Sequence, residues 1–213
     1  MTLDLPNSAE AVLFDIYGTL LDGTRRPDRG GRMADVARRF GLAHEIALDR
    51  TFDDAVAAAH HRSPEPWPEI DVREIWTEIF PAFGDADAFA LEIEDAIHAV
   101  EPTPWAEDLL DQAFARGLPA GIVSNAQAYT RLLMQRHFPR HWPRFRPDLL
   151  AFSYEHRIAK PDLRLFQKAL APLLNEGIEP ARIAMVGDSE EMDRAPAEAL
   201  GLTFLGVAAF QAP

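Results

Sequence analysis

The sequence predicts an α/β fold, a doubly wound parallel sheet with an inserted α-helical cap. After residue 104, short apolar runs alternate with segments of helical periodicity, which is typical of a parallel sheet covered by helices. A further apolar run, residues 11–17, is followed by a long stretch of helical spacing without a convincing strand. The length of 213 residues suits one domain with an insertion. We therefore expect an α/β core over 1–21 and 105–213 and a helical cap over 22–104.

The elements before residue 105 begin with a buried strand. Residues 11–17, AVLFDIY, are rich in β-forming side chains, and Gly18 closes the run. The helices expected in the cap are 32–40, 44–62, 70–80 and 85–100. Three prolines in residues 63–68 predict a stiff, exposed connector between the second and third of these helices. Within it, Trp67 either closes over a substrate or packs between core and cap.

The rest of the core is predicted as a regular alternation of helix and strand. In chain order the expected elements are helix 105–116, strand 119–123, helix 126–137, strand 149–153, helix 162–174, strand 182–186, helix 190–200 and strand 202–207. Gly117 and Gly201 follow two of these helices, as glycine often does at a helix end. Because helices join the successive strands, we expect the strands to be parallel, with their carboxyl ends at one edge.

The composition excludes several classes of function. The 34 acidic residues outnumber the 21 basic ones, and a formal charge of −13 repels nucleic acids and anionic lipids. The chain has no cysteine, which excludes disulfides, thiolate zinc sites and cysteine nucleophiles. No stretch approaches the ~18 apolar residues that span a bilayer, and the N-terminus shows no export signal. We expect a soluble, cytoplasmic protein with a small-molecule substrate.

Polar side chains follow the predicted strands, where open parallel sheets bind their ligands. Asp15 ends the first strand, and Lys160 lies in the loop after the third, facing the same crevice. In chain order the residues at this edge are Asp15, Ser124, Asn125, Lys160, Asp188 and Ser189. We expect these groups to converge on one site.

Two carboxylates at one site call for a cation. Asp15 and Asp188 repel each other unless a positive charge lies between them. Mg²⁺ prefers oxygen ligands and is usually held by one or two carboxylates together with a substrate phosphate. With the charge offset by Mg²⁺ and Lys160, one aspartate can attack phosphorus while Ser124 holds the transferring oxygens. The sequence therefore predicts phosphoryl transfer through an aspartyl intermediate.

Four segments carry a family resemblance. They are residues 14–21 (FDIYGTLL), 123–125 (VSN), 159–162 (AKPD) and 186–193 (VGDSEEMD). In order and spacing they resemble the four motifs of the haloacid dehalogenase-like (HAD) hydrolase superfamily. The helical block lies where members with a helical C1 cap carry that cap, so the resemblance covers the whole core and its insertion.

The resemblance implies roles for individual residues. Asp15 would be the nucleophile, and Mg²⁺ would bind to Asp15, Asp188 and the carbonyl of Tyr17. Ser124 and Lys160 would stabilise the charge of the phosphate. The residues expected to take part in catalysis are Asp15, Tyr17, Ser124 and Lys160. Those expected at the substrate are Thr19, Ser124, Asn125 and Lys160, supported by Ser189 and by Asp193, which would support the metal or orient Lys160.

The position of Tyr17 departs from the phosphatase pattern. Phosphatases of this family usually carry a second aspartate there as general acid and base, whereas a tyrosine with a pKa of ~10 is a poor base near neutral pH. The L-2-haloacid dehalogenases of the family also have tyrosine there and need no metal. Asp188 keeps the carboxylate that Mg²⁺ requires, which favours a phosphatase. The alternatives are a 2-haloacid dehalogenase-type hydrolase and a catalytically weak protein that binds a phosphorylated ligand.

Overall fold

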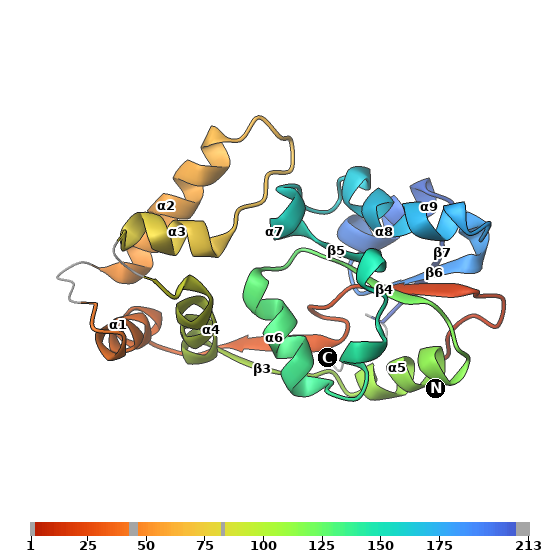
Figure 1. The fold of residues 1–213 in the computed structure, drawn as a ribbon, viewed down its shortest axis with the longest axis horizontal. Helices are drawn as coiled ribbons and strands as arrows, with labels where there is room; N and C mark the ends of the chain where they lie inside the picture. Colours follow the sequence, from red (N-terminus) through yellow and green to blue (C-terminus); the bar gives the residue numbers. More distant parts are fainter. Residues whose placement is uncertain (1–2, 43–46, 82–83, 208–213) are drawn as a thin grey trace.

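The core of the molecule is a five-stranded parallel sheet. The structure is a computed structural model that describes residues 3–42, 47–81 and 84–207. The strand order is β5-β4-β1-β6-β7 (Figure 1), and every pairing is parallel. The strands are β1 (Ala11–Phe14), β4 (Ala120–Ser124), β5 (Leu150–Phe152), β6 (Ile183–Gly187) and β7 (Thr203–Gly206). The predicted α/β fold is confirmed.

Helices cover both faces of this sheet. Val12 and Phe14 of β1 belong to a cluster with α5 (Ala106–Ala115) and α6 (Ala128–His137). Ala11 and Leu13, which alternate with them, pack with α8 (Leu163–Asn175) and α9 (Ala195–Ala199). All four β1 side chains are fully buried, as expected of a central parallel strand. Short elements complete the core: α7 (Ser153–His156), 3₁₀ turns at Trp142–Arg144, Pro147–Leu149 and Pro180–Arg182, and a π-helical turn at Glu190–Arg194.

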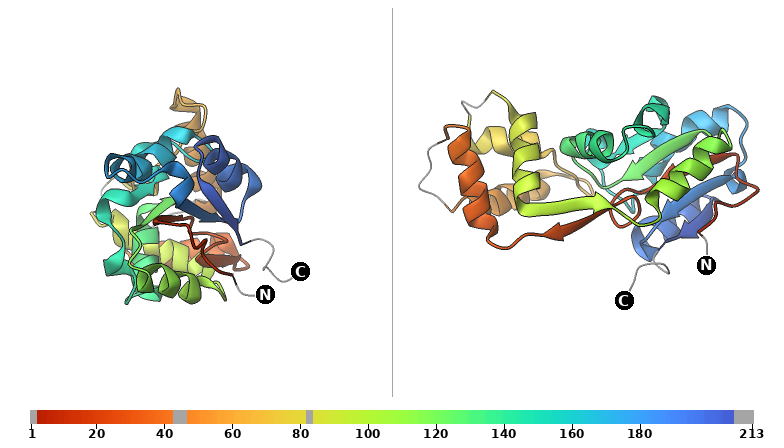
Figure 2. Two further views of the ribbon diagram at one scale, coloured as in Figure 1. Left: turned by 90° about the vertical axis from the view of Figure 1, so that its right-hand side faces the viewer. Right: turned by 90° about the horizontal axis from the view of Figure 1, so that it is seen from below.

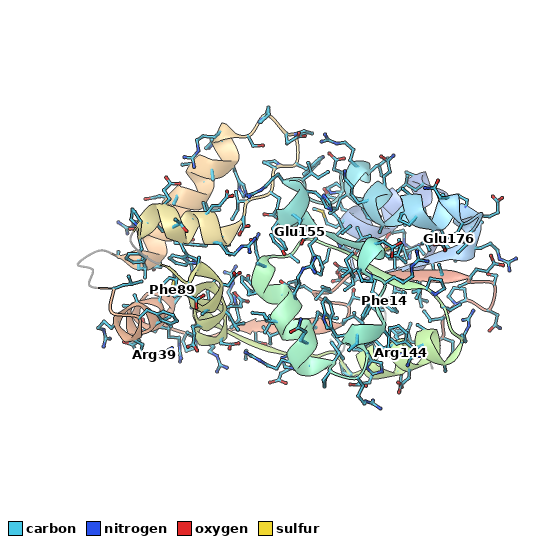
Figure 3. The ribbon with its side chains drawn as sticks, in the orientation of Figure 1. Phe14, Arg39, Phe89, Arg144, Glu155 and Glu176 are labelled. Carbon is cyan, nitrogen blue, oxygen red and sulfur yellow. The ribbon has the colours of Figure 1, made fainter. Side chains whose placement is uncertain are left out.

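The inserted cap has a hydrophobic core of its own. Its helices are α1 (Arg29–Arg39), α2 (Leu48–Arg62), α3 (Val72–Ile79) and α4 (Ala86–Ile97), at one end of the elongated molecule (Figure 2). Trp76 stacks on Phe52 with ring centroids 4.5 Å apart and meets Phe89 edge-on at 5.0 Å. Phe89 belongs to the hydrophobic cluster of the cap, and Phe14 belongs to the separate hydrophobic cluster on one face of the sheet. Both residues are labelled in Figure 3.

The expectation that the cap contains no strand is wrong. The helix expected over 85–100 ends at Ile97, and β3 (His98–Pro102) pairs antiparallel with β2 (Leu21–Arg25). This ribbon carries the chain out of the core and back (Figure 1). Local periodicity could not reveal it, because the two strands are far apart in sequence and stabilise each other by pairing. The predicted division into domains lies at this ribbon and stays a prediction.

Several predicted boundaries also shift. The first strand ends at Phe14 rather than residue 17, so Asp15 lies just beyond it. The helix expected over 190–200 is a π-helical turn followed by α9. The second cap helix begins at Leu48, and its predicted start at residue 44 lies outside the described residues. In the described part of the chain, no helix has the length and apolar character needed to cross a membrane.

Close packing between β4 and its neighbours predicts that Gly121 does not tolerate a side chain. A Cβ at this position would lie 2.5 Å from both Cβ and the carbonyl oxygen of Leu149. We expect Gly121→Ala to lower the free energy of unfolding by about 1–3 kcal/mol, as overpacking does elsewhere. Urea denaturation measures this change. Gly23→Ala is the control, because no atom lies within 4 Å of a Cβ added there. Equal loss in both variants would contradict the packing argument.

Candidate active site

The predicted residues meet at the carboxyl edge of the sheet around a small cavity. Its volume is about 160 Å³. The lining contains Asp15, Tyr17, Asn125, Lys160, Asp188, Ser189 and Asp193, together with Met192, which no sequence motif indicated. Asp15 follows β1, Asn125 follows β4, and Asp188 follows β6, so the parallel sheet itself brings these side chains together.

A buried lysine links two of the carboxylates. Lys160 Nζ donates hydrogen bonds of 2.6 Å to Oδ1 of Asp15 and 2.6 Å to Oδ1 of Asp193. All three residues are buried. Burial alone would lower the pKa of Lys160, but the charges of Asp15 and Asp193 outweigh it and raise that pKa. Lys160 is therefore an ammonium ion that touches the candidate nucleophile.

Asn125 holds the loop that carries Lys160. Its Oδ1 accepts a hydrogen bond of 2.7 Å from the backbone N–H of Lys160, and its Nδ2 donates to the Lys160 carbonyl at 3.3 Å. Both polar atoms of the Asn125 side chain are thus hydrogen-bonded to the backbone of Lys160. In this arrangement Asn125 positions Lys160, whereas the sequence analysis expected it at the substrate.

Asp193 lies on the π-helical turn, and its side chain packs against Gly187 at the end of β6. Its Oδ2 accepts from the backbone N–H of Ser189 at 3.1 Å. A Cβ on Gly187 would lie 2.5 Å from Cγ of Asp193, so only glycine allows this approach. Burial and the neighbouring Asp15 carboxylate raise the pKa of Asp193 to about 6, against the opposing effect of Lys160.

The acidic groups fit a hard divalent cation. Asp15, Asp188 and Asp193 each offer an oxygen, and these atoms lie within 4.8 Å of one another. Gly18, with φ of +79°, lets its backbone pass so close to Asp188 that an added Cβ would lie 2.3 Å from Oδ2. An all-oxygen set of this kind suits Mg²⁺. From the sequence we expected Asp15, Asp188 and the Tyr17 carbonyl as ligands and Asp193 in a supporting role; in the structure Asp193 belongs to the acidic cluster itself.

The hydroxyl group of Tyr17 is engaged by α6. It shares a hydrogen bond of 3.1 Å with Oγ1 of Thr130, which also accepts from the backbone N–H of Gln127. Burial raises the pKa of Tyr17 far above its ordinary value of 10. A phenol held in this way stays protonated at neutral pH and does not serve as a general base.

Thr19 and Ser124 are fully buried at the rear of the site. Thr19 Oγ1 donates to Oδ2 of Asp15 over a long 3.4 Å, and the Thr19 carbonyl accepts from Thr103 and from the Trp105 indole. Ser124 lies outside the cavity lining, and its Oγ has no hydrogen-bond partner among the described residues. A buried hydroxyl without a partner is costly, and a ligand oxygen is one group that would satisfy it.

The connector before α3 reaches the core, which the sequence did not reveal. Glu69 accepts a hydrogen bond of 2.7 Å from Ser153 Oγ, and the Trp67 carbonyl accepts one of 2.9 Å from Ala159 N–H. Pro68 forms a β-bridge with Ile158, two residues before Lys160. Trp67 is 43% exposed, and both its predicted roles stay predictions. These contacts join segments that are distant in sequence, so no local sequence pattern predicts them.

A larger cavity lies between the cap helices and α6. Its volume is about 440 Å³. Its polar lining consists of Arg25, Arg26, Arg29, Asp53, His60, Glu69, Glu94, His98 and Tyr129, and the rest of the lining is apolar. Burial raises the pKa of Glu94, which lies 2.9 Å from His98 Nδ1. Tyr129 lines this cavity, and the next residue, Thr130, bonds Tyr17 of the smaller one, so the two cavities are neighbours.

The raised pKa of Asp193 predicts a pH-dependent loss of stability. Between the ordinary value of 3.8 and the folded value of about 6, the folded protein binds more protons than the unfolded chain. Stability then falls as the pH rises through this window, by roughly 3 kcal/mol at most. As the pH rises through the same window, we expect the free energy of unfolding of Asp193→Asn to increase relative to that of wild type.

Urea denaturation at a series of pH values, with EDTA present, tests this expectation. Glu191→Gln removes an exposed carboxylate from the same turn and serves as the control. A difference between Asp193→Asn and wild type that stays constant with pH would show that Asp193 does not carry the raised pKa.

Comparisons with known proteins agree with this architecture. The family model for haloacid dehalogenase-like hydrolases matches residues 9–201. Among solved structures, a HAD phosphatase from Thermococcus onnurineus is similar at 23% identity and a TM-score of 0.60, over 92% of this chain and 84% of that one. A dehalogenase is similar at 19% identity and a TM-score of 0.58, over 98% of this chain and 89% of that one.

A third similar structure is a HAD family enzyme from Bacteroides thetaiotaomicron, in complex with magnesium and inorganic phosphate. It has 17% identity and a TM-score of 0.59, with 93% of each chain covered. No curated protein matches the chain. The structural likenesses show a shared fold, and the family model covers most of the sequence. The resemblance read from the four motifs is confirmed, and this chain belongs to the haloacid dehalogenase-like hydrolase family.

Proposed function

We propose that this hydrolase is an Mg²⁺-dependent phosphatase that acts on a small phosphorylated metabolite through an aspartyl-phosphate on Asp15. The observation that carries the proposal is the ammonium group of Lys160, held between Asp15 and Asp193 in a site that also contains Asp188. Three carboxylates beside one lysine leave negative charge that a divalent cation would offset. A cytoplasmic location and a small-molecule substrate are part of the same proposal.

In the first step Asp15 attacks the phosphorus of a phosphate monoester. Oδ1 is held by Lys160, so Oδ2, with only the long contact from Thr19, is the freer oxygen. A bond forms between Oδ2 and phosphorus, and the bond from phosphorus to the leaving oxygen breaks. The leaving oxygen keeps the electron pair and takes a proton from water. Lys160 and the buried Ser124 hydroxyl supply charge and a hydrogen bond to the transferring oxygens.

In the second step water attacks the aspartyl-phosphate. The bond between phosphorus and Asp15 breaks, inorganic phosphate leaves, and the carboxylate is restored. When bound at the acidic cluster, Mg²⁺ would supply positive charge that offsets the charge of the phosphate. Tyr17 provides no base for the attacking water, and general acid–base catalysis contributes roughly 10²–10⁴-fold. We expect slow turnover for this reason.

In this proposal the organic part of the substrate binds in the cavity between the cap helices and α6. Its volume of about 440 Å³ lies within the range of pockets that bind small molecules. Tyr129, which lines it, is next in the chain to Thr130, and Thr130 hydrogen-bonds Tyr17 of the Asp15 cavity. A metabolite with its phosphate at Asp15 and its organic part in the cap would use both.

Tyr17 also favours a second candidate, a 2-haloacid dehalogenase-type hydrolase. In that reaction Asp15 would displace halide from carbon, and water would then hydrolyse the ester. A phenol that stays protonated suits a reaction without a base at this position, whereas Asp188 and Asp193 have no evident use in it. The catalytically weak binding protein is the third possibility.

The first experiment compares wild type with Asp15→Asn. We expect phosphate release from a panel of small phosphomonoesters to need Mg²⁺ and to fall by at least about 10³-fold in the variant. Circular dichroism checks that the variant is folded. Asp22→Asn, which removes an exposed carboxylate of β2 that accepts a hydrogen bond from the backbone N–H of Gly23, is the control and should keep full activity.

The other outcomes replace the proposal with an alternative. Halide release from 2-haloacids without metal, lost in Asp15→Asn, would establish the dehalogenase. Thermal stabilisation by phosphorylated ligands without turnover, even after long incubation, would establish the binding protein.

Magnesium binding can be tested without any substrate. Saturation of a site at about 100 times its dissociation constant stabilises a folded protein by ~2.7 kcal/mol. We expect Mg²⁺ to raise the melting temperature of wild type and of Glu191→Gln, and to leave that of Asp188→Asn nearly unchanged. An equal rise in all three proteins would place the ion elsewhere.

A further inference from the structure

A second cluster of metal-ligating side chains lies on the core, away from the residues of the active site. It consists of Glu107 and Asp111, one turn apart on α5, and His141, which follows α6. Their ligand atoms lie within 4.8 Å of one another. Arg144, which is labelled in Figure 3, lies over the ring of Phe114 in α5 and shows the reader where this part of the core is.

Packing fixes the imidazole ring of His141. Its side chain is 3% exposed, although both acidic partners are accessible to solvent. The ring stacks on Phe114 with centroids 5.8 Å apart and meets Phe138 at 6.5 Å. Both ring nitrogens are thereby held toward α5 without any ligand.

The Nε2 nitrogen of His141 forms a hydrogen bond with Asp111. His141 Nε2 lies 2.8 Å from Oδ1 of Asp111. The side chain of Asp111 is 58% exposed, and an ionised carboxylate can only accept a hydrogen bond. Nε2 therefore carries the hydrogen. Histidines that bind metals almost always donate their second ring N–H to a carboxylate, carbonyl or water in this way.

The other ring nitrogen is buried and has no hydrogen-bond partner among the described residues. Nδ1 of His141 faces Oε2 of Glu107 at 3.6 Å. If Nδ1 carried a proton, a charge-assisted hydrogen bond would draw the two atoms to ~2.7–2.9 Å. The observed distance suits two ligands of one ion, because atoms 3.6 Å apart and each ~2.1 Å from a metal subtend roughly 120° there.

We propose that His141 Nδ1 and Glu107 bind a Zn²⁺ ion, with Asp111 as the carboxylate that orients the imidazole. Zn²⁺ is bound by imidazole nitrogen and carboxylate oxygen at these lengths. Arg140 Nη2 now lies 2.9 Å from the same Oε2 of Glu107, and its side chain is 73% exposed. The ion displaces this guanidinium into solvent. With two protein ligands the remaining positions are taken by water, so the site exchanges its metal readily.

The test follows Zn²⁺ binding to the full chain in excess Mg²⁺, which occupies the acidic cluster at Asp15. The imidazole nitrogen signals of His141, recorded by NMR in ¹⁵N-labelled protein, report this site alone. We expect the Nδ1 signal to shift on addition of Zn²⁺. Glu107→Gln and Asp111→Asn should each weaken the Zn²⁺ affinity measured from this shift by about 10–100-fold.

Asp108→Asn is the matched control, since Asp108 is an exposed carboxylate on the same helix outside the cluster. Its Zn²⁺ affinity should equal that of wild type. Two results would overturn the proposal. One is an Nδ1 signal that Zn²⁺ leaves unchanged. The other is an affinity that Glu107→Gln and Asp108→Asn change equally.

Discussion

The ion cluster of Lys160, Asp15 and Asp193 is the interaction on which the site depends. Removing one partner of a buried ion pair typically costs 3–5 kcal/mol, because the other charge is left without compensation in the protein interior. The three residues come from the end of β1, the loop before α8 and the turn after β6. Their meeting requires β1 and β6 to be neighbours in the sheet, which they are.

The surroundings of this cluster hold it in place. Asn125 fixes the backbone of Lys160, and the N–H of Ser189 fixes the carboxylate of Asp193. Two glycines, Gly18 and Gly187, make room for Asp188 and Asp193 where a side chain would collide with them. The geometry is thus built from backbone conformation and hydrogen bonding as much as from the charges themselves.

The sequence was sufficient to predict the sheet and the meeting of most of the polar residues that follow its strands. An apolar run such as residues 11–14, in a chain where strands alternate with helices, favours a central strand of a parallel sheet, and polar residues at strand ends then gather at one edge. What it could not reveal depends on contacts between distant segments. The pairing of β2 with β3, the Tyr17–Thr130 hydrogen bond and the Glu69–Ser153 hydrogen bond all join residues more than 70 positions apart.

The bridge between Pro68 and Ile158 has a mechanical consequence. If the cap swings away from the core about the β2–β3 ribbon, the hydrogen bonds that Trp67 and Glu69 make with residues 157–159 must break. Each such backbone bond contributes roughly 0.5–1.5 kcal/mol, so together they act as a latch of modest strength. The latch ends one residue before Lys160. Any movement of residues 157–159 that follows such opening would act on the backbone next to Lys160, whose ammonium group lies beside Asp15.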